Sequence, residues 1–294
     1  MGFEACHPAV NFIFFAAVFC CTASFQHPVF LAIAYLCAFA YSLKRSGKRA
    51  VTFHLCLLPL AAAFALYYSA YHHFGITVLG KNFAGNNMTL ESLVYGLVIG
   101  LRFATVCMWL EAMFRVVSSD KAVYLFGRIS PLLSLFLTIL LRLIPRIGRE
   151  ASRINLAQKG IGKGINQGSA FQRVVNCLRI FSMLITWMIS ALALESDSMR
   201  SRGSLLRGRT AFSIYRFDNR DRAFVIGLFS CITLTVMGII LGTGKMWYNP
   251  RIIWRPLSGI GALTAAGYLT LCLMPIGLEV WTEYRFAQGR RMVK

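Results

Sequence analysis

Long blocks without a single charged side chain are the feature that most limits how this chain can fold. Four such blocks lie between flanking charges: Ala5–Leu43, Ala50–Gly80, Ala223–Gly244 and Pro256–Leu278. A membrane-spanning helix needs about 20 predominantly apolar residues. The first block is long enough for two spans, separated near Gln26–Pro28, and each of the other blocks holds one.

A further span is expected at Leu90–Leu110, although Arg102 lies within it. The composition agrees, because 57% of the residues are apolar and only 14% are charged, against ~25% charged in soluble domains. The sequence therefore predicts an all-α fold, a polytopic membrane helix bundle of about six spans.

The distribution of positive charge predicts the orientation of the bundle. A net charge of +20 would suggest a nucleic-acid partner in a soluble chain, but in a membrane protein excess Lys and Arg marks cytoplasmic loops. The segment Arg142–Arg222 carries 15 Lys and Arg residues against five Asp and Glu residues. We therefore expect both termini in the cytoplasm, no nucleic acid, and three parts: spans one to four (1–114), cytoplasmic coupling helices (115–222), and spans five and six with a cytoplasmic tail (223–294).

Two apolar runs inside the expected coupling segment, 115–222, are short for membrane spans and are typical of buried or interfacial helices: Ile129–Leu141 and Ile180–Leu194. A hairpin through the membrane would place the six cations between Arg142 and Lys163 outside, against the positive-inside rule. We expect a first helix that opens at Pro145 and ends near Gly160 and Gly162.

The faces of this first helix are predicted by its spacing. One face carries apolar and polar uncharged residues, and another carries arginines: Ile147, Ala151, Ile154 and Gln158 against Arg146, Arg149 and Arg153. A second helix is expected from about Phe171 to Arg202, stopping at Gly203. Each helix ends in a cation followed by glycine, Lys159-Gly160 and Arg202-Gly203, and a cation there stabilises a helix by about 0.3–1 kcal/mol.

Three stretches carry a resemblance to a known family: IPRIGREASRINLAQKG, LESDSMRSRGSLLRGRTAF and the opening His7-Pro8. They resemble the transmembrane T component of energy-coupling factor (ECF) transporters, the EcfT/CbiQ family. The resemblance implies two crossed coupling helices whose ends, each with an Ala-Arg-Gly-like motif, dock on two ATP-binding subunits. It also implies a separate substrate-binding membrane S subunit, uptake of a vitamin or transition-metal ion, and a prokaryotic cell membrane.

The two motifs match the family unevenly. Ser201-Arg202-Gly203, preceded by Arg200, matches the second motif with Ser for Ala. At the first motif, the pattern Ala157-Gln158-Lys159 puts Ile161 in the arginine position, ahead of Gly162. The alternative register uses Gln158-Lys159-Gly160, with a lysine that lacks the planar fork of arginine.

The chain lacks the motifs of an enzyme that hydrolyses ATP itself. The glycine-rich stretch GIGKGINQG has neither the spacing nor the Ser or Thr of a phosphate-binding P-loop. We therefore expect no cofactor and ATP hydrolysis in separate subunits. Arg102 lies between Glu91 and Glu111 and is expected either to be paired or to snorkel within the bundle, or to contact substrate.

Two other functions remain open at this stage. The basic cytoplasmic surface could serve an intramembrane enzyme that holds an anionic lipid or a phosphate. The second alternative function is that of a stand-alone secondary transporter, although no inverted pair of broken helices is evident. Membrane lipid is an expected partner in each case.

The predicted topology is testable by labelling in intact cells. A cysteine introduced at Gln167 should be shielded from an impermeant thiol reagent, because the surrounding cations favour the cytoplasm. A cysteine at Asn86, in the expected outer loop, should react. Labelling at position 167 from outside would overturn the orientation.

Overall fold

The computed structural model describes residues 2–72, 74–81, 87–203, 215, 217–254 and 256–292, which form two compact units. Unit 1 comprises Met1–Ser118 and Tyr215–Lys294, and unit 2 comprises Ser119–Ile214. The expected coupling segment, 115–222, encloses unit 2.

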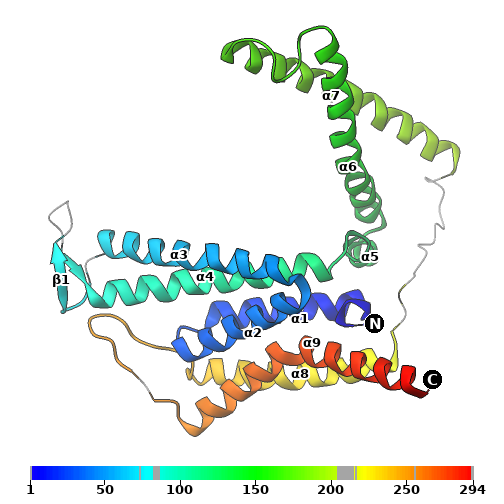
Figure 1. Cartoon of the computed structure of the whole chain (residues 1–294). Helices are drawn as coiled ribbons and strands as arrows, with labels where there is room; N and C mark the ends of the chain where they lie inside the picture. Colours follow the sequence, from blue (N-terminus) through cyan, green and yellow to red (C-terminus); the bar gives the residue numbers. More distant parts are fainter. Residues whose placement is uncertain are drawn as a thin grey trace. The chain divides into compact units, whose positions relative to one another are not determined.

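In the part of the chain that the structure describes, unit 1 is a helix bundle with one small hairpin, and unit 2 consists of three helices (Figure 1). The elements of unit 1 are η1 (Phe3–Ala5), α1 (Pro8–Ser24), α2 (Pro28–Ser46), α3 (Lys48–Tyr71), β1 (Val78–Lys81), β2 (Asn87–Thr89), α4 (Leu90–Val116), α8 (Asn219–Ile240) and α9 (Gly259–Met292). Those of unit 2 are α5 (Ser119–Ile129), α6 (Pro131–Gly160) and α7 (Ala170–Ser201). The predicted all-α polytopic helix bundle is confirmed.

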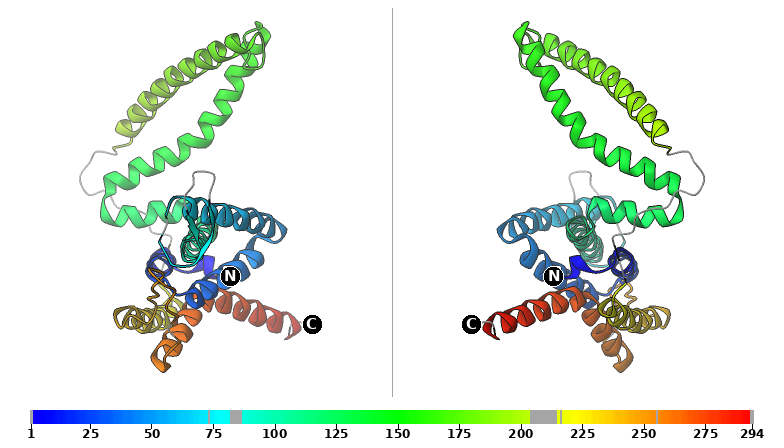
Figure 2. Two further views of the ribbon diagram at one scale, coloured as in Figure 1. Left: turned by 90° about the vertical axis from the view of Figure 1, so that its left-hand side faces the viewer. Right: turned by 90° about the vertical axis from the view of Figure 1, so that its right-hand side faces the viewer.

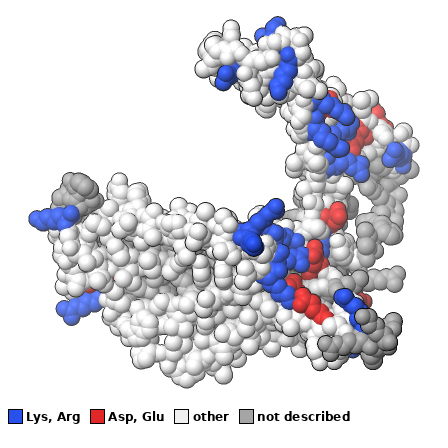
Figure 3. Space-filling model, in the orientation of Figure 1, with Lys and Arg blue, Asp and Glu red and all other residues white. Residues whose placement is uncertain are grey.

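The helices of unit 1 run alternately between two ends of the bundle. At one end, Arg45 at the end of α2 contacts Glu4 and lies 3.8 Å from the Glu279 carboxylate of α9. At the other end, the backbone N–H groups of Gln26 and His27 donate to the Gly244 carbonyl after α8. Both termini lie at the first end (Figure 1). On the face drawn in Figure 3, the charged side chains of unit 1 gather at the two ends and leave an uncharged belt between them.

The break between the first two helices lies where the sequence predicts it, at Phe25–His27. Each of the two helices begins with a His-Pro pair. The Nδ1 atoms of His7 and His27 accept hydrogen bonds from backbone N–H groups two residues later, both at 3.3 Å. The proline that follows each histidine suits the first helical turn, because it has no N–H to leave unpaired.

Six helices among the described residues are long and apolar enough to span a membrane: α2, α3, α4, α7, α8 and α9. The 17 residues of α1 fall short of this length, since they extend about 26 Å at 1.5 Å per residue. Helix α7 qualifies by length and composition, but only 6% of its apolar window is buried, against 22–39% in the other five. A cytoplasmic position of α7 stays a prediction from the charge distribution of Arg142–Arg222.

The core of unit 1 is built from large side chains and from close helix contacts. Phe3, Phe14, Tyr41, Trp109 and Tyr268 are fully buried at its centre. Helices α3 and α4 approach so closely that a Cβ atom added at Gly100 would lie 2.7 Å from the Ala61 carbonyl oxygen. Glycine is required there because only a residue without a side chain lets the two backbones meet.

Pro145 does not open a helix, which corrects the sequence-based expectation. Helix α6 begins at Pro131 and continues through Pro145 to Gly160. Pro131 takes the first-turn position, and Ser130 precedes it as the N-cap. A proline inside a helix removes one hydrogen bond and bends the helix, and α6 is bowed in Figure 2.

Gly100→Ala should lower the melting temperature of the full chain in detergent. The added methyl group meets the rigid backbone of α3, and overpacking of this kind costs about 1–3 kcal/mol. Gly277→Ala is the matched control, because nothing lies within 4 Å of a Cβ atom at Gly277. The control should be neutral or slightly stabilising. Equal melting temperatures for the two variants would contradict the close α3–α4 contact.

Candidate functional site

The two long helices of unit 2 form an antiparallel pair. Three side-chain contacts follow their length: the guanidinium of Arg142 lies 3.8 Å from the Glu195 carboxylate, Arg146 lies over the ring of Trp187 at 5.3 Å, and the Gln158 amide nitrogen lies 3.5 Å from the Met183 sulfur. The helices cross in the view of Figure 1, and Figure 2 shows both leaving the loop that joins them.

The loop between α6 and α7 is fixed by one buried amide. Asn176, which is 8% exposed, donates from Nδ2 to the carbonyls of Gly164 at 3.2 Å and Gln167 at 3.3 Å. Ser169 and Gln172 form a reciprocal capping box that starts α7. These contacts hold the end of α6 against the beginning of α7.

The C-terminal ends of α6 and α7 share the same backbone geometry. Ile161 caps α6 with φ −103° and ψ 15°, and Arg202 caps α7 with φ −83° and ψ 4°. The next residue is a glycine in the left-handed region in both cases, Gly162 at φ 77° and Gly203 at φ 74°. Each glycine N–H donates to the carbonyl three residues earlier, that of Lys159 at 3.1 Å and that of Arg200 at 3.0 Å.

This common geometry aligns the two ends residue by residue. Ile161 occupies the position of Arg202, Gly160 that of Ser201, and Lys159 that of Arg200. The helix caps thus favour the register in which the first end presents isoleucine where the second presents arginine. Ile161 is 63% exposed, and Ala157, Lys159, Gly160 and Gly162 at the first end and Arg200, Ser201 and Arg202 at the second are also exposed, with Gly203 half-buried.

The two ends lie far apart along the helix pair. Asn176 is held against the loop that follows α6, and Arg202 closes α7 about 25 residues later. At 1.5 Å per residue, the two ends are therefore separated by roughly 40 Å. A single small partner does not reach both, so the geometry suits two partners or one large one.

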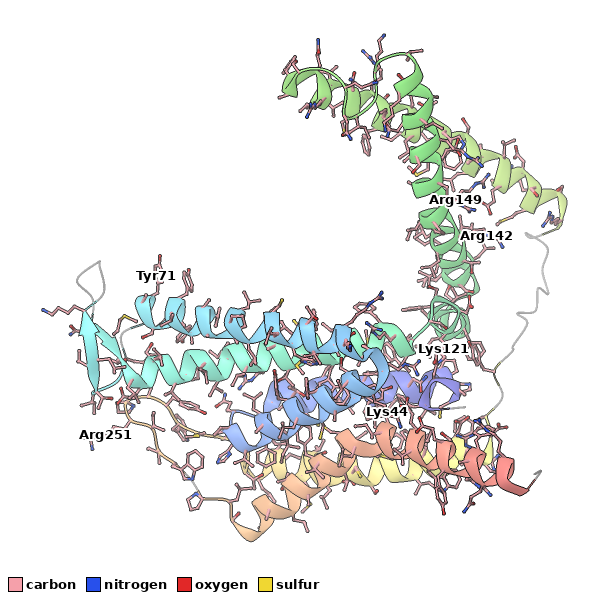
Figure 4. The ribbon with its side chains drawn as sticks, viewed as in Figure 1. Lys44, Tyr71, Lys121, Arg142, Arg149 and Arg251 are labelled. Atoms are coloured by element: carbon pink, nitrogen blue, oxygen red, sulfur yellow. The ribbon has the colours of Figure 1, made fainter. Side chains whose placement is uncertain are left out.

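The predicted faces of α6 are present. Ile147, Ala151, Ile154 and Gln158 are half-buried, whereas Arg146, Arg149 and Arg153 are exposed. Figure 4 labels Arg149 and Arg142 on α6, and Figure 3 shows Lys and Arg side chains gathered along the same helix.

The intramembrane charges of α4 are separated from one another. Glu91 accepts a hydrogen bond from the Thr77 hydroxyl at 2.6 Å, and Glu111 accepts from the Ser42 hydroxyl at 2.8 Å. Arg102, between them, is half-buried and forms no ion pair among the described residues. Burial raises the pKa of Tyr248, in the loop after α8, to about 12, and the positive charge of Arg102 acts in the opposite direction.

Two features of this site were not predicted from the sequence. Asn176 belongs to no recognisable motif, although an amide side chain among the apolar and basic residues at the start of α7 is a signal for a contact with the preceding loop. The pairing of Arg146 with Trp187 joins residues 41 positions apart, and no local spacing indicates it. A search of family models and a search of curated proteins found no match for the chain.

Asn176→Ala should loosen the loop between α6 and α7. The loss of the buried donor leaves the Gln167 carbonyl without its partner, whereas the Gly164 carbonyl keeps the Gln167 N–H at 3.1 Å. The change costs about 1–3 kcal/mol locally. We expect trypsin to cleave the folded chain after Lys159 and Lys163 roughly tenfold faster, since cleavage follows the population of the open loop. Cys177→Ala, an exposed neighbour, is the control. Equal cleavage rates in the two variants would contradict the role of Asn176.

Proposed function

We propose that this chain is the energy-coupling membrane subunit of an ATP-driven importer of the ECF type. The observation that carries the proposal is the pair of exposed helix ends with the same glycine-stopped cap, roughly 40 Å apart on one antiparallel pair. Each end is proposed to dock on one of two ATP-binding subunits. A separate S subunit in the membrane would bind the substrate, a vitamin or a transition-metal ion.

Three further properties support this proposal. The bundle of unit 1 makes the chain a multi-pass membrane protein. Unit 2 carries 14 Lys and Arg residues against four Asp and Glu residues, which favours the cytoplasmic side for this unit. Both termini in the cytoplasm and a prokaryotic cell membrane are part of the same proposal. The chain has no P-loop motif, so ATP hydrolysis is assigned to its partners.

The two ends are proposed to dock by different forces. Arg202 offers a planar guanidinium that binds a carboxylate through two hydrogen bonds. Ile161, in the equivalent cap position, offers only apolar contact, and Lys159, two residues earlier, offers a point charge. The second end would therefore dock through charge and the first through burial of Ile161 and Ala157 in an apolar groove.

Co-purification from the native membrane is the direct test of the function. Two ATP-binding chains and one further membrane protein should be retained with the tagged full chain. A chain that is purified alone and is active alone, either in transport or in turnover of a lipid, would instead support a secondary transporter or an intramembrane enzyme.

Arg202→Ala should abolish transport and weaken retention of one ATP-binding subunit, while membrane insertion survives. Truncation leaves the partner's carboxylate buried without its counter-charge, which costs roughly 2–5 kcal/mol. Lys159→Ala should cost less, by about 1 kcal/mol or more. The measurement is subunit retention in a pull-down. Wild-type uptake and retention for Arg202→Ala would exclude the docking role.

Ile161→Asp should damage the first end more than Lys159→Ala does, because it places a carboxylate in an apolar groove. Moderate salt should weaken the Arg202 contact and spare the Ile161 contact, since screening acts on charges. Subunit retention measured across salt concentrations separates the two contacts. If Lys159→Ala is as damaging as Arg202→Ala and Ile161→Asp is silent, the first docking residue is Lys159.

A further inference from the structure

A basic cavity lies between α6 and α7, away from both docking ends. It has a volume of about 340 Å³ and is lined by Arg146, Arg149, Glu150, Arg153 and Trp187. We infer that this cavity is a binding site for a phosphate group, carried either by an anionic phospholipid or by a soluble phosphate compound. This inference does not depend on the proposed function of the helix ends.

The charge balance of the cavity calls for an anion. Three guanidinium groups and one carboxylate face it, which leaves two positive charges in excess. Glu150 partly neutralises only Arg153, at 3.4 Å. Among the described residues, Arg149 takes part in no hydrogen bond or ion pair. Like charges three and four residues apart destabilise a helix, so a bound anion would remove a repulsion that the chain leaves in place.

The shape of the cavity favours a small anion held by arginine forks. Arg146 is oriented by its position over the Trp187 ring, so part of its conformational freedom is already lost. Arg149 and Arg153 follow on the same stripe of α6, at spacings of three and four residues. Guanidinium groups bind phosphate oxygens in pairs of parallel hydrogen bonds. A phosphate monoester carries a charge of about −1.5 to −2 at neutral pH, which matches the two excess positive charges of the cavity. A single carboxylate would balance only one of them.

Two sources of phosphate are available to a protein of this kind. The chain is a multi-pass membrane protein, so anionic lipid headgroups surround it, and basic cytoplasmic surfaces attract them. Soluble phosphate compounds reach the same groups from the aqueous side. The ligand chemistry is the same in both cases, and the two sources differ only in the chain attached to the phosphate.

Calorimetric titration of the full chain in an uncharged detergent tests the site. The probes are inorganic pyrophosphate, dihexanoyl phosphatidate with dihexanoyl phosphatidylcholine as its neutral reference, and tricarballylate as a carboxylate of similar charge. The variants are Arg149→Gln and Arg149→Lys. Lys163→Gln and Arg179→Gln are matched controls, because they remove the same charge from exposed positions of unit 2 outside the cavity.

We expect Arg149→Gln to weaken phosphate binding roughly tenfold or more, since each 1.4 kcal/mol of lost interaction is a factor of ten. Arg149→Lys should be intermediate, because it keeps the charge and loses the fork. The two control variants should bind phosphate with an affinity within about twofold of the wild-type affinity. Binding of phosphatidate without pyrophosphate identifies a lipid headgroup, and binding of pyrophosphate identifies a site for phosphate itself.

Three outcomes would overturn the inference: no binding of either phosphate probe by the wild type, an equal loss in the control variants, or binding of tricarballylate as tight as that of pyrophosphate. The last result would identify a docking surface for carboxylates of a protein partner. Thermal unfolding of Arg149→Gln at or slightly above the wild-type temperature separates a loss of binding from a loss of fold. This result is expected because Arg149 has no hydrogen-bond or ion-pair partner to lose among the described residues and because its removal relieves a repulsion.

Discussion

The Glu111 carboxylate fixes the end of the bundle from which the chain leaves for unit 2. It accepts hydrogen bonds from Ser42 at 2.8 Å and Ser46 at 3.1 Å, and it lies 2.7 Å from the Arg115 guanidinium. Helix α2 is thereby tied to the last turn of α4, and unit 2 begins at Ser119, a few residues later. The Glu111 side chain is only 19% exposed, and these partners offset the cost of its burial.

Unit 2 would satisfy a different requirement under the proposed function, since it would have to remain one body while its ends contact separate partners. Its helices are joined at the loop by the Asn176 amide and along their length by the Arg142–Glu195 and Arg146–Trp187 pairs. Exposed ion pairs contribute little to stability. The buried amide therefore fixes the loop end of the pair, where it donates to the carbonyls of Gly164 and Gln167.

The fold could be predicted from the sequence because membrane helices are specified by local composition. Uncharged blocks predicted five of the six candidate spans, α2, α3, α4, α8 and α9, but α1 is shorter than the expected first span and α7 has the length and composition of a span. The glycine caps predicted the ends of α6 and α7 to within a residue. The sequence could not decide where α6 begins and ends, because it offers alternative helix starts and stops of similar local energy. Pro145 suits a helix start as well as a kink, and only the competing start at Pro131 decides between them. Likewise both Lys159-Gly160 and Ile161-Gly162 are typical of a helix C-terminus. The positive φ of Gly162 shows that the helix is capped at Ile161-Gly162.

The position of the basic cavity links the two proposals. Movement of one docking end relative to the other has to pass through the contacts between α6 and α7, and Arg146, which lines the cavity, is one of those contacts through Trp187. An anion bound by Arg146, Arg149 and Arg153 would lower the repulsion along α6 and add bonds beside the helix contact. It would therefore stiffen the pair without touching either end. Occupancy of the cavity would then change how strongly the two ends are coupled, while the affinity of each end for its own partner stays the same.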